Sequence, residues 1–181
     1  MLEIRLAQTP EEREQVFKLR YQIHVEELGW VDKCENYEPN HETKTIEEPL
    51  DRTGYIFGAF EDGELAGTIR INYAKNLEDS EEYAKLYKMR EYAGDAHPLF
   101  TSITSRLMVP HHLRGKRIGL KLMQAGYKQQ LVDGIKFDFI DCENHMVPFF
   151  EKIGYQLIGS FEYEVYGNYN IMVLDLLNSS G

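Results

Sequence analysis

The stretch from Phe100 to Tyr127 constrains the fold most, because it joins three different local patterns in one run. Its first part, FTSITSRLMVP, is rich in β-branched and apolar residues and stops at Pro110, which predicts a buried strand. Its last part, LKLMQAGY, has apolar residues at helical spacing and predicts a helix entered through Gly119. Between them lies the basic loop HHLRGKRIG. A strand, a glycine-containing basic loop and a helix start predict a phosphate site, because free backbone N–H groups and the helix dipole favour an anion there.

The charge balance gives this loop more meaning. The formal net charge is −10, which argues against a nucleic-acid partner, yet Arg114, Lys116, Arg117 and Lys121 form a local basic island. An acidic body with one basic loop fits an anionic cofactor and a cationic amine acceptor. Acidity that serves solubility explains the same balance.

Length and composition indicate one globular domain. The 181 residues are 43% hydrophobic, so we expect a single domain over residues 1–177 and a tail at 178–181. No apolar run approaches the roughly 20 residues that a membrane span needs, and the N-terminus does not begin a signal peptide. The distant Cys34 and Cys142 fit a reduced cytoplasmic protein. Histidine and cysteine occur without the paired spacing of a zinc site, so we expect no metal.

The remaining segments predict both strands and helices. A strand over residues 2–7 precedes a helix that Thr9-Pro10 begins and Gly29 ends. Residues 31–53 form a long polar segment, which is uncommon in a compact domain unless it is functional or disordered. The patterns also predict a hairpin over 55–60 and 65–73, a helix over 77–93, a strand over 135–142, and a closing hairpin over 155–166 and 169–176.

The order R-G-K-R-I-G resembles the pyrophosphate loop of the GNAT acyltransferase superfamily. Arg114 and Gly119 match its first and last positions, and Arg117 stands where a glycine is usual. The resemblance covers nearly the whole chain and implies an α+β fold, an α/β/α sandwich whose mixed, mostly antiparallel sheet is splayed at the acyl-donor site. It also implies that acyl-CoA or an acyl carrier protein supplies the acyl group. The residues expected to bind this donor are Met108, Val109, Arg114, Gly115, Lys116, Arg117, Ile118 and Gly119.

Other motifs resemble one GNAT branch, the N-acyl amino acid synthases and autoinducer synthases. They are Arg20/Glu26/Trp30, Asn40-His41-Glu42, Leu50-Asp51, Arg70, Ser105-Arg106 and the series Asp141, Cys142, His145, Val147 and Phe149. The resemblance implies that Arg20, Trp30, Glu42, Asp51, Arg70 and Arg106 bind the substrate, with residues 31–53 as a lid over the acceptor. The alternative is that these residues belong to a solvent-exposed helix face and a polar surface loop without a role in binding. A charged Arg70 within a buried strand requires a partner, for which Glu26 or Asp51 is expected.

The same resemblance assigns the proton-transfer groups. The tyrosine that usually serves as the acid is replaced here by Phe150, so His145 becomes the first candidate because its pKa class suits acid–base work near neutral pH. Asp141, Glu26 and His41 complete the candidate catalytic set. A histidine that caps the helix and pairs with Asp141 is the alternative. Cys142 fits a buried small residue better than an acyl-enzyme nucleophile.

These residues favour an N-acyltransferase that moves a medium or long acyl chain to the amine of an amino acid or peptide. An acetyltransferase for small amines is the runner-up, and a non-catalytic acyl-thioester-binding module is the competing class. Homoserine-lactone synthesis from S-adenosylmethionine is disfavoured, because Ile103 replaces the glutamate usual in those synthases.

Overall fold

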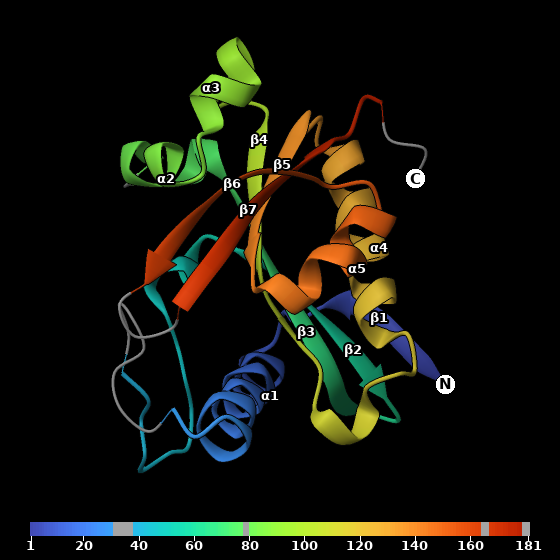
Figure 1. The fold of residues 1–181 in the computed structure, drawn as a ribbon. Coiled ribbons are helices and arrows are strands. Elements are labelled where there is room, and N and C mark those ends of the chain that lie inside the picture. Colours follow the sequence, from blue (N-terminus) through green and yellow to red (C-terminus); the bar gives the residue numbers. More distant parts are fainter. Residues whose placement is uncertain (31–37, 78–79, 164–166, 179–181) are drawn as a thin grey trace. The chain divides into compact units, whose positions relative to one another are not determined.

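The computed structural model describes residues 1–30, 38–77, 80–163 and 167–178. In this part of the chain, hydrogen bonds order seven strands as β1-β2-β3-β4-β5-β7-β6 (Figure 1). The strands are β1 (Leu2–Leu6), β2 (Tyr55–Glu61), β3 (Glu64–Tyr73), β4 (Thr101–Met108), β5 (Phe137–Cys142), β6 (Gln156–Tyr163) and β7 (Gly167–Asp175). The chain divides into two compact units, one of Met1–Arg70 with Arg106–Gly126 and one of Ile71–Ser105 with Tyr127–Gly181.

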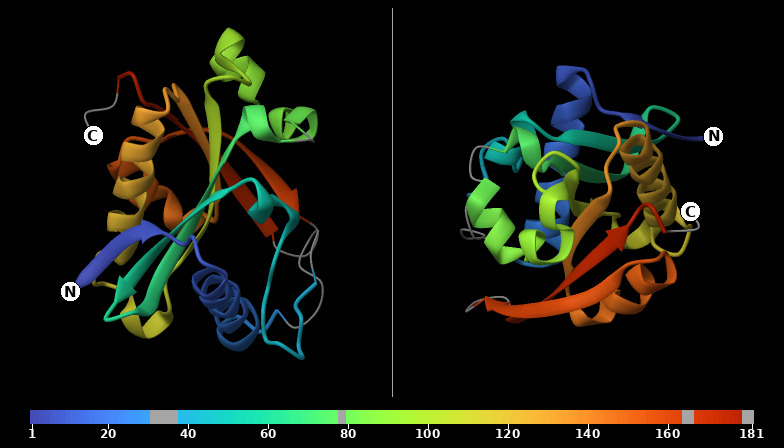
Figure 2. Two further views of the ribbon diagram at one scale, coloured as in Figure 1. Left: turned by 180° about the vertical axis from the view of Figure 1, so that it is seen from behind. Right: turned by 90° about the horizontal axis from the view of Figure 1, so that it is seen from above.

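The first unit contains the N-terminal strands and helix. β1 pairs antiparallel with β2, from Leu2 opposite Glu61 to Leu6 opposite Phe57, and the predicted β2–β3 hairpin is confirmed (Figure 2). The helix α1 (Pro10–Tyr21) begins with a capping box in which Thr9 and Glu12 each bind the other's backbone N–H. Its buried Val16 packs in a cluster with Ile56 and Phe60 of β2.

The segment after α1 differs from the single α-helix that the sequence predicts. Residues Gln22–Glu27 form a π-helical turn, η1, directly after Tyr21. The predicted stop at Gly29 is confirmed, because its φ of 77° lies in the left-handed region that glycine favours. The Trp30 N–H then donates to the His24 carbonyl at 2.8 Å.

The rest of the first unit leads to the basic loop. A short 3₁₀ helix, η2 (Pro49–Arg52), precedes β2, and another, η5 (His111–Leu113), follows the end of β4. The helix α4 (Ile118–Val132) begins after the loop, and its residues up to Gly126 belong to this unit. The strand, loop and helix predicted around residues 100–127 are therefore confirmed.

The second unit contains the C-terminal strands. β4 pairs parallel with β5, and β5 and β6 each pair antiparallel with β7. The segment predicted as one helix over 77–93 is two helices, α2 (Ser80–Leu86) and α3 (Met89–Ala93), because Lys88 adopts a left-handed φ of 56° between them. Three short helices complete the unit: η3 (Ala74–Asn76), η4 (Gly94–Ala96) and η6 (Asn144–Met146), the last of which leads into α5 (Val147–Lys152).

Candidate functional site

The basic loop of the first unit contains two residues with left-handed backbone conformation. Gly115 and Arg117 adopt φ values of 85° and 63°, both in the left-handed region. Arg117 therefore adopts a backbone conformation that glycine favours. A Cβ on Gly119 would meet only the Leu107 side chain, at 3.9 Å, so packing does not require a glycine here. The Arg114, Lys116 and Arg117 side chains are exposed, as a loop that receives phosphate requires.

A carboxylate from elsewhere in the first unit contacts this loop. Glu27, at the end of η1, accepts a hydrogen bond from the His111 N–H at 3.3 Å, and its second oxygen lies 3.9 Å from the Arg114 guanidinium. The Arg114 Nε–H donates to the Val109 carbonyl at 3.2 Å. Nothing in the sequence pattern distinguished Glu27, because it is one of two adjacent glutamates near the end of the predicted helix. Glu26 itself is exposed.

Three of the expected donor-binding residues make packing contacts or hydrogen bonds within the fold. Met108 is buried against Leu19 and Ile23, and Ile118 is buried next to Gly67, where a Cβ would come within 2.9 Å of it. Val109 is half-buried and offers its carbonyl to Arg114. The side chains of Met108 and Ile118 are therefore engaged in packing, and donor contact through the main chain of these residues stays a prediction.

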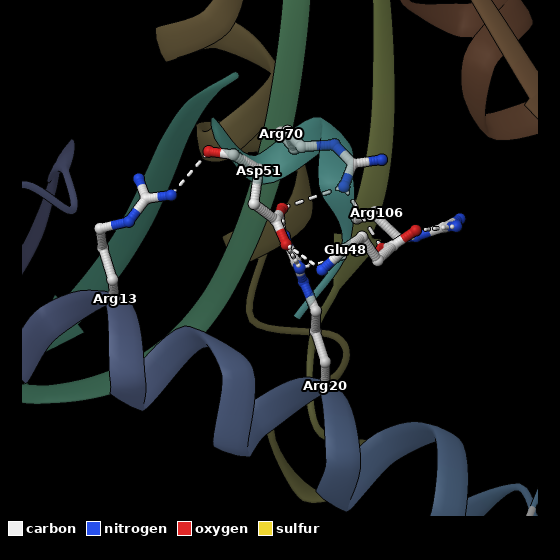
Figure 3. Close-up of polar contacts among 6 residues, drawn as sticks. All are labelled: Arg13, Arg20, Glu48, Asp51, Arg70 and Arg106. Atoms are coloured by element: carbon white, nitrogen blue, oxygen red, sulfur yellow. Dashed lines mark hydrogen bonds and ion pairs between the residues drawn. The ribbon is translucent and has the colours of Figure 1, made fainter. Parts of the chain in front are cut away.

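A buried ion cluster lies beside α1, also within the first unit (Figure 3). The Arg20 guanidinium binds both Asp51 oxygens, at 2.7 and 2.8 Å, and Arg70 reaches Asp51 at 3.0 Å. Arg70 also reaches Glu48 at 3.3 Å. The expectation that Asp51 partners Arg70 is confirmed.

Glu48 extends the cluster to β4, and sequence reasoning missed it. Arg106 binds both Glu48 oxygens, at 2.6 and 2.8 Å, although its φ of 56° is unusual within a strand. The Glu48 N–H donates to Asp51 at 2.7 Å, so the two carboxylates sit at the ends of one 3₁₀ turn. Their spacing of three residues was the signal that could have paired them.

The arginines keep both carboxylates charged. Burial on its own raises the pKa of each carboxyl, but the bond and charge of Arg106 lower that of Glu48, and those of Arg20 lower that of Asp51, each to about 2. Arg20, Asp51 and Arg70 are at most 1% exposed, so they anchor residues 48–52 to α1 and β3. The Arg106 side chain is 25% exposed, and of the expected substrate-binding arginines it has the most contact with solvent.

The other expected acceptor residues are Trp30, which directly precedes the polar segment 31–53, and His41 and Glu42 within it. Residues 31–37 of this segment, which was expected to form a lid, fall outside the described chain. His41 is exposed and its Nδ1 lies 2.8 Å from the Tyr21 hydroxyl, while Glu42 is exposed. Trp30 packs edge-on against His24, with ring centroids 4.9 Å apart. Burial lowers the pKa of His24 to about 4, so this imidazole is neutral at neutral pH.

The second unit holds the expected proton-transfer residues. The His145 side chain is 70% exposed, and its Nδ1 lies 3.3 Å from a Glu143 carboxylate oxygen. The alternative that His145 pairs with Asp141 is wrong, because Asp141 instead accepts a hydrogen bond from the Tyr87 hydroxyl at 2.7 Å. Phe150 is buried against Tyr155, with ring centroids 5.7 Å apart.

Cys142 is buried at the end of β5. Burial raises the pKa of its thiol to about 12, so a nucleophilic thiolate is scarce at neutral pH. This agrees with a packing role. Among the described residues, no group of three or more His, Cys, Asp or Glu side chains is placed to hold a metal ion. Nor does the described chain contain a helix with the length and apolarity to cross a membrane.

Solved structures with a similar fold include acyltransferases of several kinds. A putative N-acetyltransferase from Lactobacillus plantarum is 17% identical, with a TM-score of 0.68 over 97% of this chain and 98% of that one. FeeM, an N-acyl amino acid synthase from uncultured soil microbes, is 19% identical, with a TM-score of 0.68 over 98% and 92%. BjaI, a CoA-dependent acyl-homoserine lactone synthase solved with S-adenosylmethionine and isopentyl-CoA, is 23% identical, with a TM-score of 0.72 over 97% and 83%. These likenesses show the fold.

A search of curated protein sequences finds no match. The model of the acetyltransferase (GNAT) family matches residues 19–155, which span well over half of the chain and include the basic loop, the ion cluster and η6. The protein is therefore a member of the acetyltransferase (GNAT) family of acyltransferases.

Proposed function

We propose that this enzyme transfers a medium or long fatty acyl group from acyl-CoA or an acyl carrier protein to the primary amine of an amino acid or a peptide side chain. The observation that carries the proposal is the exposed basic loop, in which Arg117 holds a left-handed backbone between Gly115 and Gly119. Such a turn directs N–H groups at a phosphate, and the exposed cations add charge-assisted bonds. Both donors carry a phosphate on their pantetheine arm.

Direct attack by the amine fits the side chains of the second unit. The reaction forms a C–N bond and breaks a C–S bond, so the amine gives up a proton and the leaving thiolate takes one. The exposed His145 imidazole, beside the Glu143 carboxylate, is the group we assign to this proton transfer. Cys142 keeps its proton and forms no acyl-enzyme.

The preference for a longer acyl chain rests on the first unit. Arg20, Trp30, Asp51, Arg70 and Arg106 match the pattern of the long-chain synthases, and the buried ion cluster unites four of the five. The fold likeness to an N-acyl amino acid synthase supports an amino acid as the acceptor. Arg106 is the residue we propose for contact with the acceptor.

The deciding experiment measures thiol release from acetyl-, octanoyl-, dodecanoyl- and hexadecanoyl-CoA, each with a mixture of amino acids and with a lysine peptide. We expect release to peak with the longer chains and to require an amine. Release with acetyl-CoA alone would make the enzyme a small-amine acetyltransferase and would remove the proposed chain length.

A second candidate, a non-catalytic acyl-thioester-binding module, is favoured by one observation. Phe150, which has no hydroxyl, is buried where the family's usual acid would stand. The module would be supported if hexadecanoyl-CoA binds at equilibrium but neither acyl-CoA nor acyl carrier protein donors release thiol. Replacement of His145 by alanine separates the two: it should slow single-turnover release in an enzyme and leave binding unchanged in either case.

A further inference from the structure

A buried carboxylate in the second unit is bound by neutral donors in the described part of the chain and has no part in the chemistry above. Asp138 of β5 is 0% exposed and accepts hydrogen bonds from the hydroxyls of Ser102 at 2.6 Å, Thr104 at 2.7 Å and Tyr155. Ser102 and Thr104 lie on β4, and Tyr155 immediately precedes β6. All three donors are neutral, so the carboxylate is held by hydrogen bonds alone within this group.

A glutamine fixes the direction of these hydrogen bonds. The Gln130 amide of α4 donates to the Ser102 hydroxyl at 3.0 Å and to the Thr104 hydroxyl at 3.3 Å. Each hydroxyl has one proton, and with the amide on its oxygen that proton points to Asp138. A protonated Asp138 would need an acceptor for its own proton, and one of the three hydroxyls would have to turn to provide it. The network is therefore fully satisfied when Asp138 is ionised.

The carboxylate spans the point where β4 and β5 stop pairing. In the described chain, the parallel ladder between them consists of three residue pairs: Thr101 with Phe137, Ser102 with Asp138 and Ile103 with Phe139. Ser102 is thus the ladder partner of Asp138, while Thr104 is the first residue of β4 beyond the last pair. Ser102 and Thr104 share a face of the strand, because side chains alternate along it. We call the point beyond Ile103 and Phe139 the strand fork.

We infer that Asp138 is a positioning residue that fixes the separation of β4 and β5 at the strand fork, and so holds the β4 main chain beyond Ile103 in the position in which it would pair with the donor's pantetheine arm. This inference rests on the proposed function and on the family resemblance, which implies that the arm pairs with the main chain of β4. The bond from Thr104 to Asp138 is the part of the network that holds the fork, since it ties the first residue of β4 beyond the ladder to a residue of β5 within it.

The test compares two variants that each remove one hydroxyl from Asp138. Thr104→Val removes the bond beyond the ladder and keeps the side-chain shape, whereas Ser102→Ala removes the bond within the ladder, where backbone pairing persists. We expect Thr104→Val to weaken CoA binding and to raise the KM for acyl-CoA about three- to tenfold, with kcat less affected. Ser102→Ala should shift both by less than about twofold. Tyr73→Phe is the control for lost stability, because its hydroxyl binds Asp133 elsewhere in the unit.

The pH profile supplies a readout that a purely structural role would not change. Burial raises the pKa of Asp138 to about 6 against the lowering effect of its hydrogen bonds, and the pKa of Tyr155 is raised well above its usual range, so Asp138 alone in the network titrates near neutral pH. CoA affinity should fall as the pH drops through this value in the wild type and not in Asp138→Asn. The comparison cancels the titration of the donor's own phosphates.

The outcomes separate the inference from the function on which it rests. If the wild type binds CoA and releases thiol but Thr104→Val matches Ser102→Ala, the assignment of the fork to Asp138 is overturned and the acyltransferase stands. If the wild type neither binds nor turns over any acyl thioester, the proposed function fails and the inference fails with it. Should Asp138→Asn not fold, the pair of hydroxyl variants still decides.

Discussion

Arg117 is the residue at which this loop departs from the family pattern, and its backbone compensates for the departure. At a φ of 63° it adopts the turn that a glycine would make at no cost, while its exposed guanidinium adds a charge that glycine lacks. Under the proposed function, the replacement exchanges the conformational ease of glycine for electrostatic attraction to the donor's phosphate.

Substitutions of Arg117 should separate these two contributions. Arg117→Gly keeps the turn and loses the charge, so we expect CoA affinity to fall a few-fold while the unfolding free energy changes by less than about 1 kcal/mol. Arg117→Glu reverses the charge beside the phosphate and should weaken CoA binding by at least about tenfold, with acceptor affinity less affected. Titration calorimetry with each ligand checks both. Lys128→Glu, an equal charge reversal later on α4, is the control, and equal affinities in all four proteins would refute the loop assignment.

Asp51 carries the largest single contribution that we expect to stability. Asp51→Asn removes a charge that holds Arg20 and Arg70 in a wholly buried site, and breaking a buried ion group in this way typically costs about 3–5 kcal/mol. Urea unfolding measures the loss. Asp62→Asn, an exposed carboxyl in the β2–β3 turn, should change the midpoint little, and a similar small effect at Asp51 would show that the cluster does not anchor residues 48–52.

At the scale of elements, the sequence was informative where the apolar period and the capping residues agreed. Thr9-Pro10 and Gly29 bound the first helical segment as expected. The π-helical turn within it was not predictable, because the change in hydrogen bonding leaves the spacing of apolar residues almost unaltered. The break at Lys88 was missed for a related reason: a lysine with positive φ carries no turn signal.

The candidate site was predictable to a similar degree. The loop and the pairing of Arg70 with Asp51 followed from charge within an apolar context. Glu48 and Glu27 did not, because each is one acid among many in an acidic chain and acquires its role through a partner distant in sequence. Contacts of this kind depend on tertiary packing, on which local patterns carry no information.

Glu27 connects η1 to the basic loop and should oppose donor binding. Its carboxylate lies against the His111 N–H and the Arg114 guanidinium, and we assign the guanidinium to a phosphate, so a donor must compete with Glu27 for Arg114. We expect Glu27→Gln to tighten CoA binding about two- to fivefold, as befits a partly exposed pair. The exposed Glu64→Gln is the matched control, and weaker binding in Glu27→Gln would instead mean that Glu27 positions Arg114.

At the scale of the whole molecule, buried ionisable groups make opposing contributions to the pH dependence of the unfolding free energy. In the first unit, Arg106 and Arg20 lower the pKa values of Glu48 and Asp51, and burial with help from the same arginines lowers that of His24. In the second unit, burial raises the pKa of Asp138. Proton uptake on unfolding therefore differs in sign between the two sets.

The stability of the wild type should consequently change little from pH 6.5 to about 4.5 and fall steeply below. Between its unfolded pKa of 6.5 and its folded value of about 4, His24 binds a proton more readily when unfolded, so its contribution is lost as the pH falls. Asp138 acts oppositely between about 6 and 3.8, because the folded state binds the proton first. Glu48 and Asp51 lose their contribution from about 4.5 down through about 2. In Asp138→Asn the compensating contribution disappears, so urea unfolding at a series of pH values should show stability declining already between pH 6 and 4. Parallel curves for the two proteins would mean that Asp138 titrates alike in the folded and unfolded states.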